Sequence, residues 1–441
     1  MIVGGAVRDA LLLSKPASKD VDIEVYGLSA KEALISALSK IGAVDERGIA
    51  FGVVAASVDG EDFDISFPRR DSVDGAGHRG FNADIDPGLD IRVAFGRRDF
   101  TINAIGFDPA TEELVDPFSG ANDLRAGVLR HTSDAFVEDP LRVLRGVQFA
   151  GRFGFVLAPD TATLCRTIVP LFAELSVERV WGEWRKLARR AVFWPEALTA
   201  LAQTGWDVHF PELAATKGIR QDPEWHSEGD VWTHLGLAAR AAALAAESAK
   251  LSDKDREVAV LGALVHDFGK VTHTTFEGKR IRSTGHAEAG VAPAKRFLNR
   301  IGAPHWIAER VLPIVAEHMS HTSVEGAPSP AAVKRLIRRL KRNESGASIY
   351  DWARVVDADC AGRGRSAKRS PAGRWLAVAE KVGPGPRPSL LRGEHLIERG
   401  LKPGPGFGSI IQASIIAQDD GVFDDIDGAT RWLDEYLESA R

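Results

Sequence analysis

Two aspartates, Asp20 and Asp22, stand two positions apart in the segment SKDVDIEVYG. Its apolar alternation predicts a strand, in which residues i and i+2 leave from the same face. Two such carboxylates can share divalent cations, one activating an attacking 3'-hydroxyl and the other neutralising a triphosphate and its leaving pyrophosphate. Asp64, which alternates with Asp62 in EDFDISF, is the preferred third carboxylate. The alternative is an acidic edge strand exposed to solvent.

A glycine turn precedes this pair of aspartates. Gly4 and Gly5 follow a short apolar run, expected to be a very short strand, and precede an expected amphipathic helix. Glycines let backbone N–H groups approach an anion closely, and a helix N-terminus adds partial positive charge. Arg8 could add a forked contact to phosphate oxygens. The alternative is a tight turn without a ligand.

Histidines and aspartates form a second candidate site later in the chain. His266 and Asp267 are adjacent near the end of an expected apolar helix, in LGALVHDFGKVTH (261–273), and Lys270 follows. The residues that could complete a metal shell are His234, His286, His318 and Asp359. Imidazole and carboxylate ligands suit Mg²⁺ and divalent transition metals, so the pattern predicts a metal site without naming the ion. For each histidine taken alone, the alternative is a buried core residue or a surface group.

The elements that must position these residues change character along the chain. The first 130 residues alternate short apolar runs with one helical stretch, 29–41, which predicts a mixed sheet with few helices. From about residue 134 the apolar period is that of helices. The predicted fold class is therefore α+β. Segments rich in Pro and Gly predict boundaries, and the four expected domains are a catalytic head (1–130), a helical neck and body (131–222), a metal domain (223–380) and a helical tail (381–441).

The composition is that of an ordinary globular protein, with 44% hydrophobic and 27% charged residues in a chain of 441. No apolar run is long enough for a bilayer and no signal peptide is visible, so we expect a cytoplasmic location and no membrane partner. The two cysteines offer neither a disulfide framework nor a zinc site. The net charge is −5, but basic residues cluster at 334–342 and 363–374. These clusters could contact phosphates, and the alternative is a solvated helix face and loop.

Five segments occur in an order typical of a known family: GGAVRD, KDVDI, RRDFTINAIGFD (97–108), LVDPFSGANDL (114–124) and EDPLRVLRGVQFAGRFGF (138–155). They resemble class II tRNA nucleotidyltransferases and bacterial poly(A) polymerases, a branch of the polymerase β superfamily. The segment 261–273 and its candidate ligands resemble an HD-type phosphohydrolase domain. The resemblance implies a polymerase β-like head with a mixed sheet, an all-α neck and body, and a helical HD domain.

The resemblance implies a role for each matching residue near the start of the chain. Asp20 and Asp22 would bind magnesium in the head, and Asp64 would complete the catalytic carboxylates. Gly5 and Arg8 would contact the phosphates of the incoming nucleotide.

Further matching residues would hold the rest of the nucleotide. Arg98 and Asp99 would bind the triphosphate and the ribose, Asp99 accepting a ribose hydroxyl proton. Asp139 and Arg142 would hydrogen-bond the base edge of CTP or ATP in place of a nucleic-acid template. Arg145, about one helical turn after Arg142, would reach the phosphates from the same face.

Two features depart from the family pattern or bear on its specificity. Gln148 stands where the family commonly has another arginine, which puts one phosphate contact in doubt. The segment 67–90 is rich in Gly, Asp and Arg without an apolar period, and we expect a loop there. In the family a flexible loop of this region is implicated in the switch from CTP to ATP.

The function implied is template-independent addition or repair of the 3'-terminal CCA of tRNA from CTP and ATP, with release of pyrophosphate. A poly(A) polymerase or an A-adding enzyme shares every head motif, although the acidic end of this chain disfavours the basic RNA-binding extension of poly(A) polymerases. A different class, metal-dependent phosphohydrolysis of nucleotides or RNA ends by the HD domain, predicts activity that survives loss of Asp20 and Asp22. A catalytically silent RNA-binding protein is disfavoured because the motifs are complete.

Overall fold

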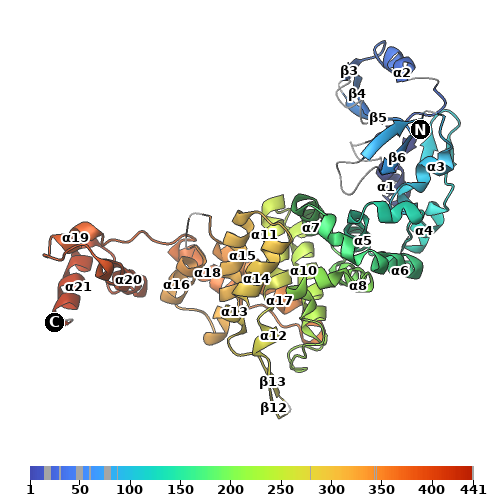
Figure 1. The fold of residues 1–441 in the computed structure, drawn as a ribbon. Helices are drawn as coiled ribbons and strands as arrows, with labels where there is room; N and C mark the ends of the chain where they lie inside the picture. The colour runs from blue at the N-terminus through green and yellow to red at the C-terminus, as the bar shows by residue number, and fades with distance from the viewer. Residues whose placement is uncertain are drawn as a thin grey trace. The chain divides into compact units, whose positions relative to one another are not determined.

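The chain folds into two compact units, residues 1–209 and residues 210–441, shown in Figure 1. The computed structural model describes residues 1–13, 21–28, 31–45, 53–58, 61–73, 81–86, 88–278, 280–341, 343 and 345–439. None of the helices in these ranges combines the length and the apolar run that crossing a membrane requires. The division into four domains expected from the sequence is finer than these two units and stays a prediction.

A seven-stranded mixed sheet forms the core of the first unit's N-terminal part, as predicted. Its order is β3 (Ala43–Asp45), β4 (Val53–Val58), β5 (Glu61–Ser66), β2 (Asp22–Glu24), β1 (Ile2–Val3), β8 (Gly106–Asp108) and β9 (Glu113–Val115). The pair β2 and β5 is parallel, and the other neighbours are antiparallel. Helix α2 (Lys31–Leu38) lays Leu34 and Leu38 against buried side chains of β4 and β5. The apolar alternation of these strands therefore supplies one buried face.

The segment 67–90, expected to be a loop, instead contains the antiparallel strands β6 (Arg69–Val73) and β7 (Phe81–Ile85). The two strands form a sheet of their own. The loop prediction was wrong for these strands because main-chain hydrogen bonds hold a two-stranded ribbon, and such pairing needs no apolar period. Helix α3 (Ile91–Gly96) follows, with the Asp90 side chain accepting from two of its first backbone N–H groups.

Helices make up the rest of the first unit. Helix α5 (Leu141–Phe153) packs against α7 (Val177–Arg190) and α8 (Trp194–Gln203), and α4 (Gly120–Ala126) and α6 (Pro159–Thr167) complete the set with the short strands β10 (Val128–Leu129) and β11 (Val156–Leu157). The ring of Phe100 meets Phe136 and Phe149 edge to face, with centroids 5.5 and 5.8 Å away. This buried contact fixes the segment that follows Arg98 and Asp99 against α5.

The second unit is a helical bundle. Its centre is formed by α10 (Val231–Ser248), α11 (Asp253–Val265), α15 (His305–Glu317) and α17 (Ile349–Ala361). Around it lie α9 (Pro211–Ala214), α12 (Lys270–His273), α13 (His286–Ala289), α14 (Val291–Arg300), α16 (Pro330–Leu340) and α18 (Ala372–Val382). A hairpin of β12 (Thr275–Glu277) and β13 (Arg280–Arg282) projects from these helices (Figure 1).

The last helices, α19 (Gly393–Ile397), α20 (Pro405–Asp420) and α21 (Ile426–Ser439), build a small apolar cluster of their own. Leu396 and Leu433 are buried in it, and Trp432 and Leu437 pack against it. The final helix therefore packs into this cluster through one apolar face.

Candidate active site and metal centre

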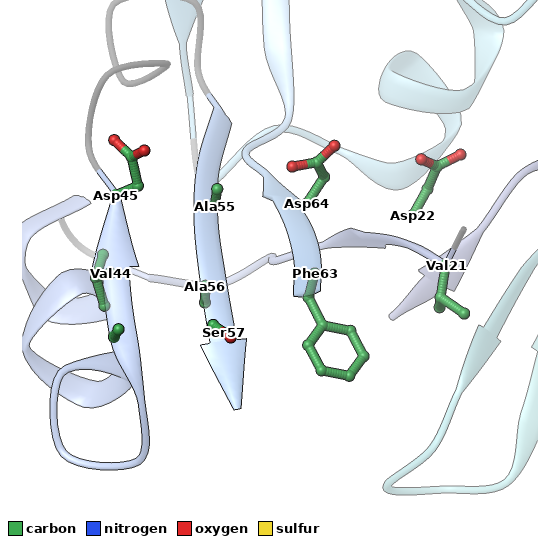
Figure 2. A pocket seen from close by; sticks show the side chains of 10 residues that line it. Val21, Asp22, Val44, Asp45, Ala55, Ala56, Ser57, Phe63 and Asp64 are labelled. Carbon is green, nitrogen blue, oxygen red and sulfur yellow. The ribbon is translucent and has the colours of Figure 1, made fainter. Parts of the chain in front are cut away.

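The carboxylates of the head lie in a row across the sheet. Asp22 is the register partner of Asp64 in the parallel pair of β2 and β5. One strand further Ala55 faces Asp64, and beyond it Asp45 faces Ala55. Figure 2 shows the carboxylates of Asp22, Asp64 and Asp45 pointing to the same side of the sheet. Asp20 lies outside the described residues.

This row brings together two of the predicted catalytic carboxylates and adds one that the sequence did not suggest. Asp22 and Asp64 are both exposed, and they line the pocket drawn in Figure 2 together with Asp45. Their oxygens are hard donors of the kind that Mg²⁺ prefers. Asp45 could not be found from spacing, because only the strand register places it in line with Asp64, one strand beyond Ala55.

The glycine turn lies directly against these residues. Gly4 has a φ of +70°, and a Cβ atom there would lie 2.8 Å from Nη1 of Arg98 and 3.7 Å from Oδ2 of Asp22. Only a glycine combines this backbone conformation with so close an approach. Arg98 also donates from Nη2 to Oε2 of Glu24 at 2.8 Å, on the same strand as Asp22. The turn therefore holds an arginine next to the carboxylate row.

One cavity of the first unit collects eight of the ten residues predicted for the head: Gly5, Arg8, Asp22, Arg98, Asp99, Asp139, Arg142 and Arg145. Asp64 lies in the neighbouring pocket, which shares Asp22 with this cavity. The cavity also contains residues to which no role was assigned from sequence: Gly4, Arg97, Asn103, Leu141 and Arg179. Six arginines in one cavity create a strongly positive potential suited to a polyphosphate.

Asp99 is buried and held by a network of hydrogen bonds. Oδ1 accepts from the backbone N–H of Phe100 and from Nδ2 of Asn103, both at 2.8 Å, and Oδ2 accepts from Nε of Arg145 at 2.6 Å. Burial alone would raise the pKa of Asp99, but Arg145 and Asn103 hold it below its ordinary value. Three of its four acceptor positions are used, so this ionised carboxylate can still accept one more hydrogen bond.

Arg8 is buried in the same network. It donates from Nη1 to Oδ1 of Asn103 at 2.6 Å and from Nε to Oδ1 of Asp9 at 2.7 Å. Its guanidinium carbon lies 4.9 Å from the ring centroid of Phe153. These contacts fix one face of Arg8, while the residue still lines the cavity. Gln148, on α5, is buried and does not line it.

Asp139 and Arg142 also line this cavity. Both oxygens of Asp139 accept from Nη2 of Arg179, at 3.0 and 2.8 Å. Arg142 donates to the carbonyl of Ala135 at 2.6 Å and to that of Arg97 at 2.7 Å. Arg179, on α7, therefore orients Asp139, which sequence reasoning missed because Asp139 precedes α5 and lies 40 positions away in the sequence.

The second unit brings the predicted metal ligands together. Nε2 of His234 lies 3.2 Å from Oδ1 of Asp359 and 3.6 Å from Oδ2 of Asp267. Nε2 of His266 lies 3.3 Å from the same Asp267 oxygen and 3.4 Å from Nε2 of His234. These four atoms come from α10, the turn after α11, and α17, and they surround one point.

The other predicted ligands surround a second point. Oδ1 of Asp267 lies 3.1 Å from Nε2 of His286 and 3.6 Å from Nε2 of His318, and the two imidazole nitrogens lie 3.1 Å apart. Asp267 thus faces one group with each oxygen. Gly269 makes this possible, because a Cβ there would lie 2.0 Å from the carbonyl oxygen of His286.

Each of the four histidines points its Nε2 atom at one of these two centres, and Nδ1 faces an acceptor on the other side of the ring. Nδ1 of His234 lies 2.8 Å from Oε1 of Glu228, and Nδ1 of His266 donates to the carbonyl of Ala263 at 2.8 Å. His286 and His318 likewise donate from Nδ1 to backbone carbonyls, at 2.5 and 2.7 Å. A neutral ring with its proton on Nδ1 has a lone pair on Nε2.

The described residues give the centre no hydrogen-bond donor that would satisfy Oδ1 of Asp267, although this atom is buried. Facing lone pairs and a buried carboxylate repel one another unless a cation lies between them. The donor set of imidazole nitrogens and carboxylate oxygens fits divalent ions. The second unit therefore contains two groups of side chains that could hold divalent ions.

The carboxylates of the centre are ionised. Burial would raise the pKa of Asp267, but His266 and Lys270 hold it well below its ordinary value. Asp359 is also held well below, by His234 and by Arg363, which binds it with two N–H donors at 3.1 and 2.6 Å.

Two buried residues around the ligands were not predicted in these roles. Oε1 of Glu228 lies 2.8 Å from Nδ1 of both His226 and His234, and against the effect of burial these two imidazoles lower the pKa of Glu228 to about 2. Lys270 lies 2.6 Å from Oδ2 of Asp267 and donates to Gln221 at 2.7 Å. Lys270 is therefore not the solvated helix end that its sequence position allowed. Glu228 was missed because it lies in a Gly-rich and Pro-rich segment that predicts only a boundary.

A cavity opens onto the metal centre. Asp267, His286, His318 and Asp359 form its floor together with Lys270 and Arg363. Its remaining walls are Gln221, Asp222, Trp225, His226, Ile281, Arg282, Ser283, Thr284 and Met319. Cations beside metal ligands are suited to an anionic substrate such as a phosphate ester.

Family models match this chain in both of its units. A family model described as the poly A polymerase head domain matches residues 1–130, and one described as the HD domain matches residues 231–358. The chain is 36% identical to the multifunctional CCA protein of Xanthomonas campestris pv. campestris over 371 residues, 82% of this chain and 85% of that protein. It is 34% identical to that of Xanthomonas oryzae pv. oryzae over 426 residues, 94% and 97% of the two chains.

Solved structures share the fold. The CCA-adding enzyme of Bacillus stearothermophilus in complex with CTP superposes with a TM-score of 0.64 at 23% identity, over 100% of this chain and 93% of that one. The Thermotoga maritima CCA-adding enzyme complexed with tRNA gives 0.56 at 20% identity, over 99% and 90%.

The mixed sheet, the arginine-lined cavity and the HD centre define a nucleotidyltransferase with a fused HD domain. The chain belongs to the multifunctional CCA protein family.

Proposed function

We propose that the first unit adds the 3'-terminal CCA to tRNA from CTP and ATP and releases pyrophosphate. The observation that carries this proposal is the single cavity in which the glycine turn, Asp22 and six arginines meet. The names of the relatives support it, as do the CTP and the tRNA in the titles of the structural neighbours.

The carboxylates of Asp22 and Asp64, with Asp20, would hold Mg²⁺ at the sheet. When bound, such ions lower the pKa of the 3'-hydroxyl and neutralise charge on the triphosphate. The backbone N–H at Gly5 and the guanidinium groups of Arg8 and Arg98 bind the phosphates, with the N-terminus of α1 (Gly5–Leu13) pointing at them.

The sugar and the base would contact the other end of the cavity. Asp99 accepts a ribose hydroxyl with its remaining acceptor position, and Arg145 and Asn103 keep its carboxylate in place. Asp139 and Arg142 hydrogen-bond the base edge, and Arg179 orients Asp139 for that contact. A bidentate contact of this kind discriminates between bases by about 1 to 3 kcal/mol.

The test is incubation of the protein with Mg²⁺ and a tRNA transcript that lacks CCA, with CTP and ATP given separately and together, followed by sequencing of the 3'-ends. We expect CCA and then a stop, and loss of all addition in Asp22→Asn and Asp64→Asn. A single A on tRNA ending in CC would replace the proposal with A addition. A long A tail would replace it with poly(A) synthesis.

A second function is supported by the HD centre. We propose that it hydrolyses phosphate esters of nucleotides or RNA ends: water adds its oxygen to phosphorus, the P–O ester bond breaks, and the leaving oxygen takes up a proton. The supporting observation is the buried pair of ligand groups beneath a cavity that contains Lys270 and Arg363. Phosphate release with Mg²⁺, Mn²⁺ or Ni²⁺ that persists in Asp22→Asn and disappears in Asp267→Asn is the expected result, and release unaffected by Asp267→Asn would contradict it.

A further inference from the structure

An exposed tryptophan lies at the mouth of the metal-centre cavity. Trp225 lines this cavity and is 39% exposed, although large aromatic side chains are usually mostly covered. Nζ of Lys368 lies 3.8 Å from the centroid of its ring. An exposed ring beside a cation is the kind of platform on which nucleic-acid bases stack.

The segment that carries Trp225 is held from two sides. Arg280, in the projecting hairpin, donates to Asp222 with Nε at 3.0 Å. On the other side Ser227 donates to the carbonyl of Arg363 at 3.3 Å and accepts from the backbone N–H of Ser366 at 3.1 Å. The turn that carries Trp225 is therefore held in place by contacts on both sides, and the basic segment that begins at Arg363 lies against it.

The basic segment differs from the other cationic cluster of the unit. On α16, three arginines are paired with carboxylates: Arg335 with Asp420, Arg338 with Asp419 and Arg339 with Glu317. Within the part of the chain that the structure describes, Arg365, Lys368 and Arg369 form no ion pair, and the sequence from 363 to 374 contains no acidic residue. All three are exposed. Unpaired cations next to a stacking surface match a single-stranded polyanion that carries bases.

We propose that residues 222–228 and 363–369 form a track that binds single-stranded RNA and leads its end to the metal centre. One base stacks on Trp225, and the neighbouring backbone phosphates contact Arg365, Lys368 and Arg369. The substrate class of the HD centre is then an RNA end and not a free mononucleotide. The assignment of an RNA end as the substrate rests on the phosphohydrolase function proposed above. The binding of RNA to the track does not depend on that function.

The binding is tested by cross-linking the full chain, loaded with Mg²⁺, to an oligouridylate that contains 4-thiouridine. Mass spectrometry then locates the cross-linked peptides, and cross-links in the first unit serve as the internal reference. We expect cross-links in 222–228 and 363–369. Trp225→Ala lowers their yield at subsaturating RNA by at least about 5-fold, the weaker end of base–aromatic stacking.

The charge contribution is tested with a matched pair of variants. Arg365→Ala/Arg369→Ala removes two cations of the track, whereas Lys334→Ala/Lys341→Ala removes two cations from the other basic cluster. The first variant reduces the slope of log affinity against log salt at the track by about 1.4, since each single-strand phosphate contact contributes about 0.7. The control variant leaves that slope unchanged. Equal losses in both variants, or cross-links confined to other peptides, would overturn the track.

Hydrolysis distinguishes this inference from the function on which it builds. Wild-type protein is given glycerol phosphate, uridine 3'-monophosphate and an oligouridylate with a 3'-phosphate, and released phosphate is measured. We expect kcat/KM to be highest for the oligonucleotide and to fall further in Trp225→Ala for it than for glycerol phosphate. Equal efficiency with the mononucleotide would overturn the RNA-end assignment. No hydrolysis of any ester, with cross-links still in the track, would reject the phosphohydrolase and leave the binding surface supported.

Discussion

Replacing Asp267 with Asn tests whether the HD centre holds two ions that share one carboxylate. Oδ2 of Asp267 faces His234 and His266, and Oδ1 faces His286 and His318. Asp267 is 1% exposed, so its carboxylate is shielded from solvent and no group at the surface can supply the negative charge in its place. Because the same side chain belongs to both ligand groups, a single substitution should abolish binding at both.

The magnitude follows from the position of each residue around the centre. Loss of a group that only orients a metal ligand lowers metal affinity by about 10- to 100-fold. Glu228 is such a group, since its Oε1 lies 2.8 Å from Nδ1 of His234, and Glu228→Gln should fall in that range. Asp267 is itself a shared anionic ligand, so Asp267→Asn should weaken both ions by more than about 100-fold. His286→Ala and Asp359→Asn should each remove one ion and leave the other.

The assay is equilibrium dialysis against Mn²⁺ followed by elemental analysis, together with urea unfolding to confirm that each variant folds. The expected numbers of bound ions in the second unit are two for wild type, one for each single-group variant and none for Asp267→Asn. CTP affinity of the first unit, measured in parallel, should stay unchanged. Retention of an ion by folded Asp267→Asn, or loss of both ions in His286→Ala, would refute the shared-ligand arrangement.

Three further predictions concern the head. Gly4→Ala should weaken CTP binding because the new Cβ meets Arg98. At Gly27 φ is +75° and no heavy atom of the described residues lies within 4 Å of a new Cβ, so Gly27→Ala should cost only the backbone strain of about 1 to 2 kcal/mol in urea unfolding and leave CTP binding intact. Asp99→Asn should reduce the dependence of the free energy of unfolding on pH in acid. Because the pKa of Asp99 is depressed in the folded state, its ionised form contributes stability above the unfolded pKa near 3.8, and this contribution is lost as pH falls through the lower folded pKa, with a slope of up to about 1.4 kcal/mol per pH unit. An equal slope in the wild-type protein and in the variant would contradict this prediction. Arg179→Ala should free Asp139 and raise misincorporation of UTP or GTP by about 10-fold or more in single-turnover assays, and unchanged selectivity would remove Arg179 from base recognition.

The fold was predictable where local pattern and long-range pairing agree. The alternation of β4 and β5 indicated strands, and the change to helical periodicity near residue 134 precedes α5. The ribbon of β6 and β7 was missed because its pairing is made by the main chain, which the side-chain pattern does not encode. The acidic side chain of Asp45 was missed for a related reason, since only the register of β3, β4 and β5 brings it into line with Asp64.

The sequence predicted the candidate metal ligands better than the residues that orient them. His234, His266, His286 and His318 were identified from residue type and from the motif around Asp267, and the structure brings them together. Glu228 and Arg179 act on residues of other elements, and no spacing in the sequence connects them with His234 or Asp139. Residues that orient a functional group are chosen by packing in three dimensions, so the signal for them appears only in the folded chain.

The sequence by itself determined the chemistry available to this protein, because residue type fixes which groups can bind metals, phosphates and bases. It supplies paired carboxylates near a glycine turn, the arginines of α5, and the adjacent His266 and Asp267 with histidines distant in the sequence. Tertiary structure decided how these groups are combined. The register of β2 and β5 sets Asp22 beside Asp64, and the close approach at Gly269 lets Asp267 face two groups of ligands. Among the residues that the structure describes, it also left Arg365 and Arg369 without ion pairs while pairing the arginines of α16, since only folding decides which carboxylates come within reach.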